Sequence, residues 1–299
     1  MGRRTNRHKN KGRKSGKKII GVVIFLMFIL GGVAGATIFF MSNNKTVAIS
    51  EGNQETKVTA EVPKPLSLPP KEERENTTIP ILMYHLVDDE AGSLEGLYLR
   101  TSEFEEHLQY FKDNNFTPIT MRDLAAYWEG TKALPEKPIV LTFDDSSVTV
   151  YNNAYPLMKK HGFVSTQFVI SSHLGNGGVM TEDQVKEMAA AGHEIGSHSY
   201  SHLDLANASE STLEQEVLQS KKDLEALVGQ PVVSFCYPAG KFSTTVQNYL
   251  EKSGYLSAVT TVNGFANKTE QGAFELQRIR INRGDDGATL KEKLSGYGL

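Results

Sequence analysis

The stretch IVLTFDDSSVTVY, residues 139–151, runs an apolar segment straight into two adjacent carboxylates, Asp144 and Asp145. Its apolar part, PIVLTF at 138–143, is typical of a β-strand that is buried on both faces. Two like charges at the end of such a strand repel each other, and the loss of water adds to the cost. A bound metal ion is a partner that would offset this cost. The stretch alone leaves an alternative open, a solvated loop in which both aspartates form turns.

The segments on either side of this stretch predict an α/β fold. From about residue 78 onward, short apolar runs alternate with helical patterns, and the sequences Ser102-x-x-Glu105, Thr181-x-x-Gln184 and Ser211-x-x-Glu214 resemble capping boxes at helix starts. This alternation indicates a parallel sheet with both faces covered, in an α/β barrel or an open α/β fold. Chemistry in such folds gathers at the carboxyl ends of strands. The expected strands are 79–87, 138–143, 165–171, 193–199, 232–238, 257–262 and 276–282.

A second candidate for metal binding follows the expected strand at 193–199. The sequence GSHSYSH places His198 and His202 four residues apart, and on a helical turn this spacing puts both imidazoles on one side. Two histidines and one carboxylate form a three-ligand site with an open position, which suits a catalytic metal ion. Zinc is the default ion for these ligands, although cobalt, nickel and manganese fit them too. Two solvated loop histidines are the simpler alternative.

The N-terminal part of the chain predicts a membrane anchor. Residues 1–18 hold nine Lys and Arg and no acidic residue, and residues 19–41 (IIGVVIFLMFILGGVAGATIFFM) hold no charged residue. Twenty-three helical residues span roughly 35 Å, enough for a hydrocarbon core of about 30 Å. The flanking positive charges predict a cytoplasmic tail at 1–18, a transmembrane signal-anchor at 19–41 and an extracellular remainder in the cell membrane. The alternative is a secreted protein cleaved near Ala36.

The remaining composition is consistent with a membrane-anchored domain. The proline-containing polar segment 42–78 predicts an extracellular linker, a disordered stalk, ahead of one domain at 79–299. Outside the basic tail, 23 basic residues face 35 acidic ones, and we expect no nucleic-acid partner. The single cysteine, Cys236, excludes an internal disulfide, so this domain depends on its core.

The motifs TFDD and HSYSH, in this order, resemble those of carbohydrate esterase family 4, the polysaccharide deacetylases with a nodulation-protein-B homology domain. The stretch MTEDQVKEMAAAGHEIGSHSYSHLDL is similar to the helix that leads into the family's second motif, and the resemblance covers residues 79–299. It implies a distorted (β/α) barrel that hydrolyses N-acetyl groups on a sugar polymer. It also implies that Asp145, His198 and His202 hold the metal ion and that Asp144 is the general base.

The acid that protonates the leaving amine is expected at His85. Many members of the family supply this group from a histidine near the C-terminus, but the last histidine of this chain is His202. The sequence ILMYHLV places His85 at the end of the first expected strand. This resembles the circularly permuted branch that deacetylates poly-β-1,6-N-acetylglucosamine. The alternative is a structural histidine that caps the strand end. The other histidines considered are expected on helices or near loops, in structural roles: His107, His161, His173 and His193.

Two motifs depart from the family pattern. Ser146 stands where the first motif has glycine, and the third motif is written CYPAG, with Cys236 at an arginine position and Ala239 at a tyrosine position. The backbone N–H of Ala239, after Pro238, could still donate to an oxyanion because that role needs no side chain. Tyr237 or Phe242 could replace the lost aromatic wall for a sugar ring. Three arginines could orient Asp144: Arg278, Arg280 and Arg283.

These inferences predict a metal-dependent hydrolase that removes N-acetyl groups from GlcNAc residues of an extracellular or cell-wall polysaccharide, either poly-β-1,6-GlcNAc or peptidoglycan. Two alternatives stay open. One is a catalytically silent wall-binding protein of the same fold. Three departures from the family pattern support it: Ser146, Ala239 and the missing C-terminal histidine. The other is an esterase that removes O-acetyl groups from polysaccharide by the same chemistry.

Overall fold

A computed structural model describes residues 68–90 and 95–297 of the chain. The expected basic tail (1–18), the expected transmembrane segment (19–41) and most of the expected linker (42–78) lie outside these residues. No helix in the described ranges is long and apolar enough to cross a membrane. The last residues of the expected linker belong to the folded unit, because α1 (Lys71–Glu75) packs against α3 (Met121–Glu129).

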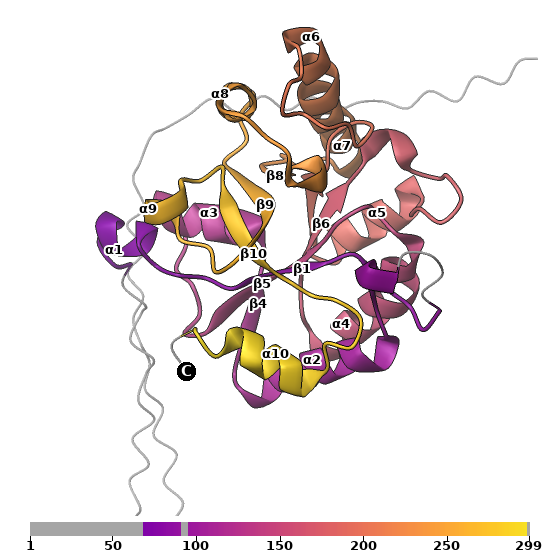
Figure 1. The fold of residues 1–299 in the computed structure, drawn as a ribbon, viewed down its shortest axis with the longest axis vertical. Helices are drawn as coiled ribbons and strands as arrows, with labels where there is room; N and C mark the ends of the chain where they lie inside the picture. Colours follow the sequence, from indigo (N-terminus) through magenta and orange to yellow (C-terminus); the bar gives the residue numbers. More distant parts are fainter. Residues whose placement is uncertain (1–67, 91–94, 298–299) are drawn as a thin grey trace, which may run out of the picture. The chain divides into compact units, whose positions relative to one another are not determined.

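Seven parallel strands of the described chain close into a barrel (Figure 1). Their order is β1-β10-β9-β8-β7-β6-β5, and β5 pairs again with β1, where Ile81 lies opposite Val140 and Tyr84 opposite Phe143. A further strand, β4, pairs with the first residues of β5. The strands are β1 (Ile81–Tyr84), β4 (Thr117–Ile119), β5 (Pro138–Phe143), β6 (Thr166–Val169), β7 (Glu194–Ser197), β8 (Ser234–Cys236), β9 (Ser257–Asn263) and β10 (Leu276–Arg280).

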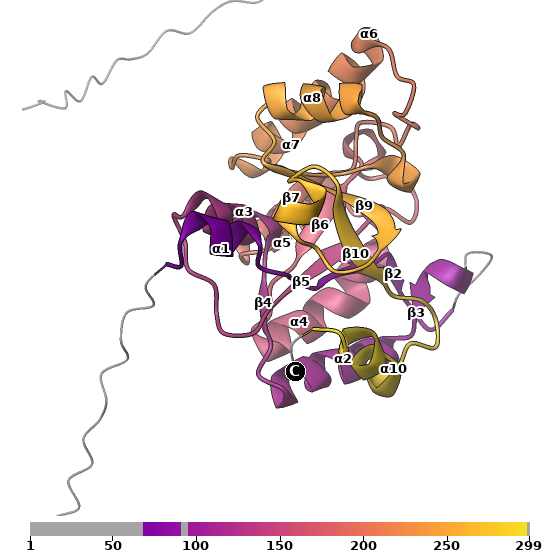
Figure 2. The same ribbon diagram turned by 60° about the vertical axis from the view of Figure 1, so that its left-hand side comes forward.

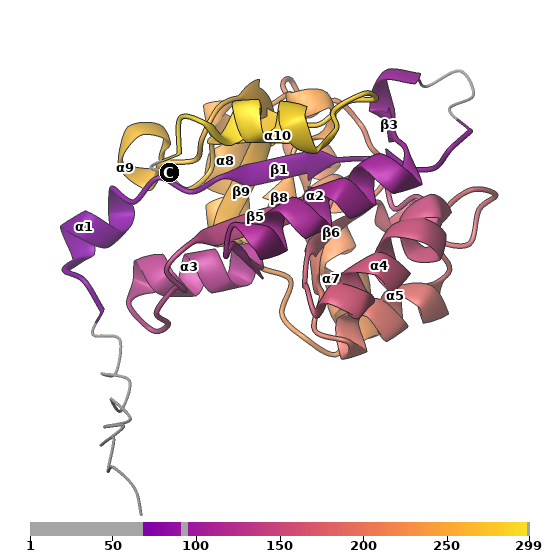
Figure 3. The same ribbon diagram turned by 90° about the horizontal axis from the view of Figure 1, so that it is seen from below.

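Helices surround the barrel between successive strands. The helix α2 packs against α4 and α10 (Figure 3), and α6, α7 and α8 lie together at the top of Figure 2. Their bounds are α2 (Thr101–Asp113), α4 (Tyr155–His161), α5 (Glu182–Ala190), α6 (Glu210–Leu213), α7 (Ser220–Val228), α8 (Thr244–Lys252), α9 (Lys268–Gln271) and α10 (Gly287–Leu294). Two π-helical segments, η2 (Val150–Ala154) and η4 (Glu214–Gln219), precede α4 and α7. There are three 3₁₀ turns in the described residues, η1 (Glu95–Leu97), η3 (Ser171–His173) and η5 (Pro238–Gly240). A separate pair of short strands joins β2 (Leu86–Val87) to β3 (Tyr98–Leu99).

Alternate residues of each strand separate an inner core from an outer one. Leu141 and Phe143 of β5 belong to the outer core, together with apolar residues of α2 and α5. Val140 belongs to the inner cluster, with Phe168 of β6 and Val259 of β9. The same alternation turns Thr142 and then Asp144 toward the barrel interior. A charged residue just past β5 therefore stands above the inner core.

Two of the three expected capping boxes are misplaced. Thr181 does cap α5, and its hydroxyl accepts from the Gln184 N–H. However, α2 begins at Thr101, where the Glu103 carboxylate accepts from the Arg100 N–H, and Ser209 caps α6 through the Thr212 N–H. The Ser-x-x-Glu pattern is common by chance, so the tertiary contacts of each segment decide which residue serves as the cap.

Candidate active site

The carboxylate of Asp144 lies in a fork formed by Arg278. Asp144 follows β5, Arg278 belongs to β10, and both side chains are buried. The two terminal guanidinium nitrogens each donate to one carboxylate oxygen of Asp144 at 2.8 Å. Further bonds from Arg278 to the Thr142 hydroxyl (3.0 Å) and the Thr260 carbonyl (2.9 Å) fix the fork. This bidentate geometry fixes the orientation of Asp144.

The fork also sets the charge of Asp144. Burial alone favours the neutral acid, but the Arg278 guanidinium outweighs it and holds the pKa of Asp144 well below its usual value. The Cys236 thiol donates weakly to Asp144 at 3.5 Å, and burial raises the pKa of that thiol. Asp144 is therefore an oriented, ionised carboxylate. Of the three arginines considered from the sequence, Arg278 donates to Asp144, whereas Arg280 donates to Asn282 and Arg283 donates to the Asp89 carbonyl.

Asp145, His198 and His202 form a three-ligand cluster. The ring Nε2 atoms of His198 and His202 lie 3.4 and 3.5 Å from the same oxygen of Asp145. These separations are longer than most hydrogen bonds. Two ligands at about 2.1 Å from a tetrahedral zinc ion would be about 3.4 Å apart. Both nitrogens thus lie at the distance from Asp145 that two ligands of one ion have, all three ligand atoms lie within 4.8 Å of one another, and the residues fit a metal site.

The backbone orients His198 as a metal ligand. Its Nδ1 lies 2.8 Å from the Cys236 carbonyl, which can only accept, so Nδ1 carries a proton and Nε2 faces the cluster. Burial lowers the pKa of His198, but the groups of Cys236 and the carboxylates of Asp145 and Asp144 raise it well above its usual value. A metal ion and a proton therefore compete for Nε2.

The two histidines do not lie on a helical turn. The segment after β7 is a loop, and Ser199 and His202 have left-handed φ values of 66° and 62°. The expectation of a helical turn is therefore wrong, although the rings meet with centroids 4.8 Å apart. The loop is bent so that the fourth residue returns to the first, as a helical turn would do.

A second group of possible ligands, Asp144, His198 and Cys236, also lies close together. Its chemistry is less suitable. Both oxygens of Asp144 already accept from Arg278, and burial keeps the Cys236 thiol protonated, whereas a thiol must lose its proton to bind a metal ion. Asp145 remains available, so the geometry favours the cluster of Asp145, His198 and His202.

His85 lies beside Asp144. It follows β1, is almost completely buried, and its Nε2 is 3.8 Å from an oxygen of Asp144. Burial lowers the pKa of His85, and the Asp144 charge opposes that shift. The buried Nδ1 of His85 has no hydrogen-bond partner within the described ranges. The structure thus brings His85 together with the aspartate that precedes the metal cluster, as expected.

Ser146 is part of the backbone framework. Asp145 and Ser146 both have left-handed φ values, 68° and 58°, a conformation that favours glycine. The hydroxyl of Ser146 accepts from the buried Ile170 N–H at 2.9 Å, at the end of β6. Ser146 therefore uses its hydroxyl to join two strand ends.

The CYPAG segment exposes one of its expected substrate contacts and buries another. Ala239 is exposed, with a φ of 50°, and Pro238 before it is buried. The Tyr237 ring is fully buried and its hydroxyl donates to the Phe274 carbonyl, so its expected role as an aromatic wall is wrong. Phe242 stacks on Tyr237 at 4.9 Å and is partly exposed, which leaves it as the aromatic candidate.

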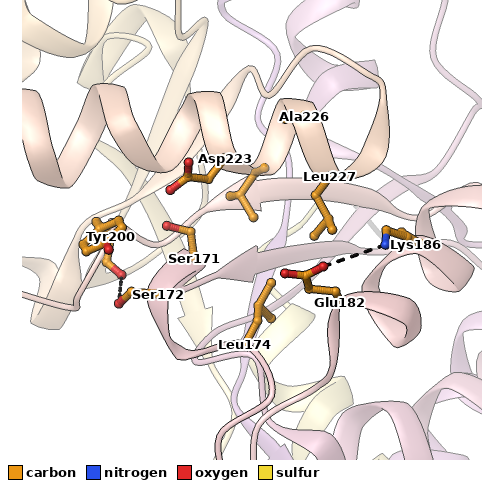
Figure 4. Close-up of a pocket in the computed structure, with 10 residues that line it drawn as sticks. Ser171, Ser172, Leu174, Glu182, Lys186, Tyr200, Asp223, Ala226 and Leu227 are labelled. Carbon is orange, nitrogen blue, oxygen red and sulfur yellow. Dashed lines mark hydrogen bonds and ion pairs between the residues drawn. The ribbon is translucent and has the colours of Figure 1, made fainter. Parts of the chain in front are cut away.

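A cavity of about 490 Å³ lies beside the loop that carries the histidines (Figure 4). Tyr200 lines it, and the Ser172 hydroxyl donates to the Tyr200 carbonyl at 2.6 Å. The other walls come from α5 and α7, including Glu182, Lys186 and Asp223. Neither the cluster of Asp145, His198 and His202 nor His85 lines this cavity, so it is adjacent to the cluster rather than part of it.

Comparison with known proteins gives consistent matches. The family model for polysaccharide deacetylases matches residues 131–258. YxkH of Bacillus subtilis, a protein named for polysaccharide deacetylase, is 32% identical over 246 residues, which cover 82% of each chain. The poly-beta-1,6-N-acetyl-D-glucosamine N-deacetylase of Staphylococcus aureus is 27% identical over 167 residues, 51% of this chain and 57% of that protein. The structure of the Streptococcus pyogenes deacetylase PplD, solved with acetate, matches with a TM-score of 0.69 and 29% identity over 73% of this chain and 98% of that one.

Proposed function

The chain belongs to the polysaccharide deacetylase family, and on that premise we propose that it is a metal-dependent hydrolase that removes N-acetyl groups from GlcNAc residues of an extracellular or cell-wall polysaccharide. One observation carries the proposal. A cluster with the spacing of a three-ligand metal site lies directly beside an oriented, ionised carboxylate. Poly-β-1,6-GlcNAc and peptidoglycan are the two candidate substrates.

Asp145, His198 and His202 would hold the ion, and zinc is the first candidate for these ligands. When bound, the ion would polarise the amide carbonyl and make a water molecule more acidic. A histidine nitrogen must be free of its proton to bind the ion, so metal affinity should depend on pH.

Asp144 and His85 divide the proton transfers. Asp144 does not ligate the ion, and Arg278 keeps it ionised, so it accepts a proton from the attacking water. His85 first takes up a proton, a form that the nearby Asp144 charge favours against burial, and its imidazolium gives this proton to the amine nitrogen as the carbon–nitrogen bond breaks. The products are acetate and a free amino sugar, and each group returns to its initial state by exchange with solvent. General acid–base catalysis of this kind is worth on the order of 10²–10⁴-fold.

The substrate contacts are assigned to the exposed part of the CYPAG segment. The Ala239 N–H would donate to the developing oxyanion, and Phe242 would pack against a sugar ring. Ala239 leaves this part of the site open, as a long polymer requires. Pro238 holds the backbone that presents the N–H group.

We also propose that residues 19–41 anchor the protein in the cell membrane and that residues 42–67 connect the anchor to the catalytic unit on the extracellular side. The uncharged run of 23 residues and the basic segment before it support this topology. An anchored catalytic unit suits a surface polymer better than a diffusing metabolite.

The test is acetate release by the full-length chain, purified in detergent, from four substrates: β-1,6-GlcNAc oligomers, chitin oligomers, peptidoglycan and acetylated xylan. Each is measured with added Zn²⁺, with chelator, and with Asp144→Asn as the control for contaminating activity. Release from one GlcNAc polymer that chelator abolishes would support the proposal and identify the substrate. Release from xylan alone would favour the O-acetyl esterase. A folded chain that binds metal and releases no acetate would favour the silent wall-binding protein.

A further inference from the structure

The loop between the two histidine ligands is bent and needs external support. It runs from Ser197 to His202, and its residues Ser199 and His202 occupy the left-handed region. The Cβ atom of a non-glycine residue is crowded by the backbone in this conformation. Neighbouring groups must therefore hold the loop in place if His202, the most exposed of the three ligands, is to stay beside His198.

Every second residue of SHSYSH is a serine, and each of the three supports the loop. Ser197 accepts from the Ser199 N–H at 3.2 Å and shares a hydrogen bond of 2.8 Å with Ser220 of α7. The Ser199 hydroxyl accepts from the His202 N–H at 2.9 Å. Ser201 is the third, and it connects the loop to a different residue, Glu216.

Glu216 binds the loop through three hydrogen bonds. One carboxylate oxygen accepts from the Ser201 N–H at 2.8 Å, and the other accepts from the Ser201 hydroxyl at 2.6 Å. The backbone carbonyl of Glu216 accepts from the Tyr200 N–H at 2.9 Å. The Glu216 side chain is buried, with 4% of the residue exposed, and it forms no ion pair with a residue in the described part of the chain. Burial of a carboxylate is costly unless it is hydrogen-bonded, and the Glu216 carboxylate meets this need through its two bonds to Ser201.

The backbone around Glu216 is a π-helix. The segment η4 interrupts the helix that α6 begins and α7 continues, and π-helical turns often occur at functional sites. Two successive residues of the turn, Glu216 and Val217, are buried. Their carbonyls then accept from outside the helix, from the Tyr200 N–H and from the Tyr255 hydroxyl. The irregular turn is thus where the helix contacts the metal-site loop.

We propose that Glu216 is a positioning residue for the metal site, which fixes Ser201 and through it the neighbouring ligand His202. The proposal rests on the proposed function for the existence of the metal ion, but its test is metal affinity rather than turnover. Loss of a group that supports a ligand from outside typically costs about 10- to 100-fold in metal affinity. We expect a loss of this size when the Glu216 carboxylate is removed.

The experiment compares Glu216→Ala with Glu216→Gln and with Glu214→Ala in the full-length chain. Glutamine can accept from the Ser201 N–H and donate to the Ser201 hydroxyl, so Glu216→Gln should keep a metal affinity close to that of the wild type. Glu214 lies in the same π-helical segment but is exposed, and Glu214→Ala is the matched control. Metal-free protein is titrated with Zn²⁺ by calorimetry and with Co²⁺ by its visible absorption spectrum, and thermal unfolding is recorded without metal.

We expect weaker binding of both ions and an altered Co²⁺ spectrum in Glu216→Ala alone. If Glu216→Ala does not fold, Ser201→Ala removes one of the two carboxylate contacts and should give a smaller loss of affinity. A Glu216→Ala protein that unfolds at lower temperature but binds metal like the wild type would overturn the positioning role. A wild-type chain that binds neither ion would overturn both this inference and the metal dependence. The expected affinities without any acetate release would overturn the proposed function alone.

Discussion

Replacement of Arg278 by methionine tests the central pair of the site. Methionine keeps much of the length of arginine but has no charge and no donor. In the wild type, Arg278 is fully buried and donates twice to Asp144, once to Thr142 and once to Thr260. Arg278→Met therefore leaves a buried carboxylate whose remaining described donor is the weak thiol of Cys236.

The expected cost follows from that isolated charge. Removal of one partner from a buried ion pair typically lowers the free energy of unfolding by about 3–5 kcal/mol. Asp144→Asn removes the charge on the other side, and the double variant Asp144→Asn with Arg278→Met has neither charge. In the Asp144→Asn background, Arg278→Met should cost less, because the guanidinium has already lost its charged partner and its removal leaves no buried carboxylate behind. The difference between the two costs should fall at about 1–3 kcal/mol.

The assay is urea unfolding of the four proteins at neutral pH, followed by circular dichroism. Equal costs of Arg278→Met in both backgrounds would refute the reasoning, because Arg278 would then act independently of Asp144. The pH profile of acetate release gives a second test. Burial raises the pKa of Asp144 and Arg278 lowers it, so loss of the guanidinium should move the acid limb to higher pH. Arg278→Lys keeps the charge but cannot form the bidentate contact. Its acid limb should therefore lie between those of the wild type and Arg278→Met.

Three further predictions concern single residues. His85→Ala should lower turnover by on the order of 10²-fold or more and leave Zn²⁺ affinity unchanged; unchanged turnover would remove His85 from the mechanism. Ser146→Ala should lower the free energy of unfolding by about 1–3 kcal/mol, because the buried Ile170 N–H loses its acceptor; Ser146→Gly should cost less, because glycine relieves the left-handed φ, and the opposite order would contradict this account. Burial lowers the pKa of His193 from 6.5 to about 4, so the unfolded chain binds more protons between these values, and stability should fall by up to about 3 kcal/mol as the pH drops from 6.5 to 4. His193→Gln should flatten that dependence in urea titrations across the same range.

The parallel strands were predictable because they are buried on both faces and read as apolar runs. The expected strand 138–143 coincides with β5, the expected strand 257–262 ends one residue before β9 does, and the other expected strands contain β1, β6, β7, β8 and β10. The short strand β4 and the helix α3 were not predicted. The helix α3 is capped by Thr120 with Asp123 at the third position, a variant of the capping pattern that a search for glutamate or glutamine overlooks.

The closure of the barrel was not visible in the sequence. Apolar runs indicate strands but do not say which strands are neighbours, and β1 pairs with both β5 and β10 across long separations. The same limit applies to the bend that brings His202 back to His198. A spacing of four residues suggested a helical turn, whereas serine and glutamate contacts from η4 and α7 hold a loop in the left-handed region.

The sequence by itself determined which residues are candidates for the chemistry of the site. Carboxylate and imidazole groups bind metal ions and transfer protons in any fold, so Asp144, Asp145, His85, His198 and His202 could be named from their types and their places at strand ends. Only the tertiary structure decided which arginine reaches Asp144, that Tyr237 lies in the core, and that Glu216 supports the loop. Each of these depends on side chains that meet across the barrel or between a helix and a loop, as Arg278 and Asp144 do over 134 positions, and local pattern carries no record of such contacts.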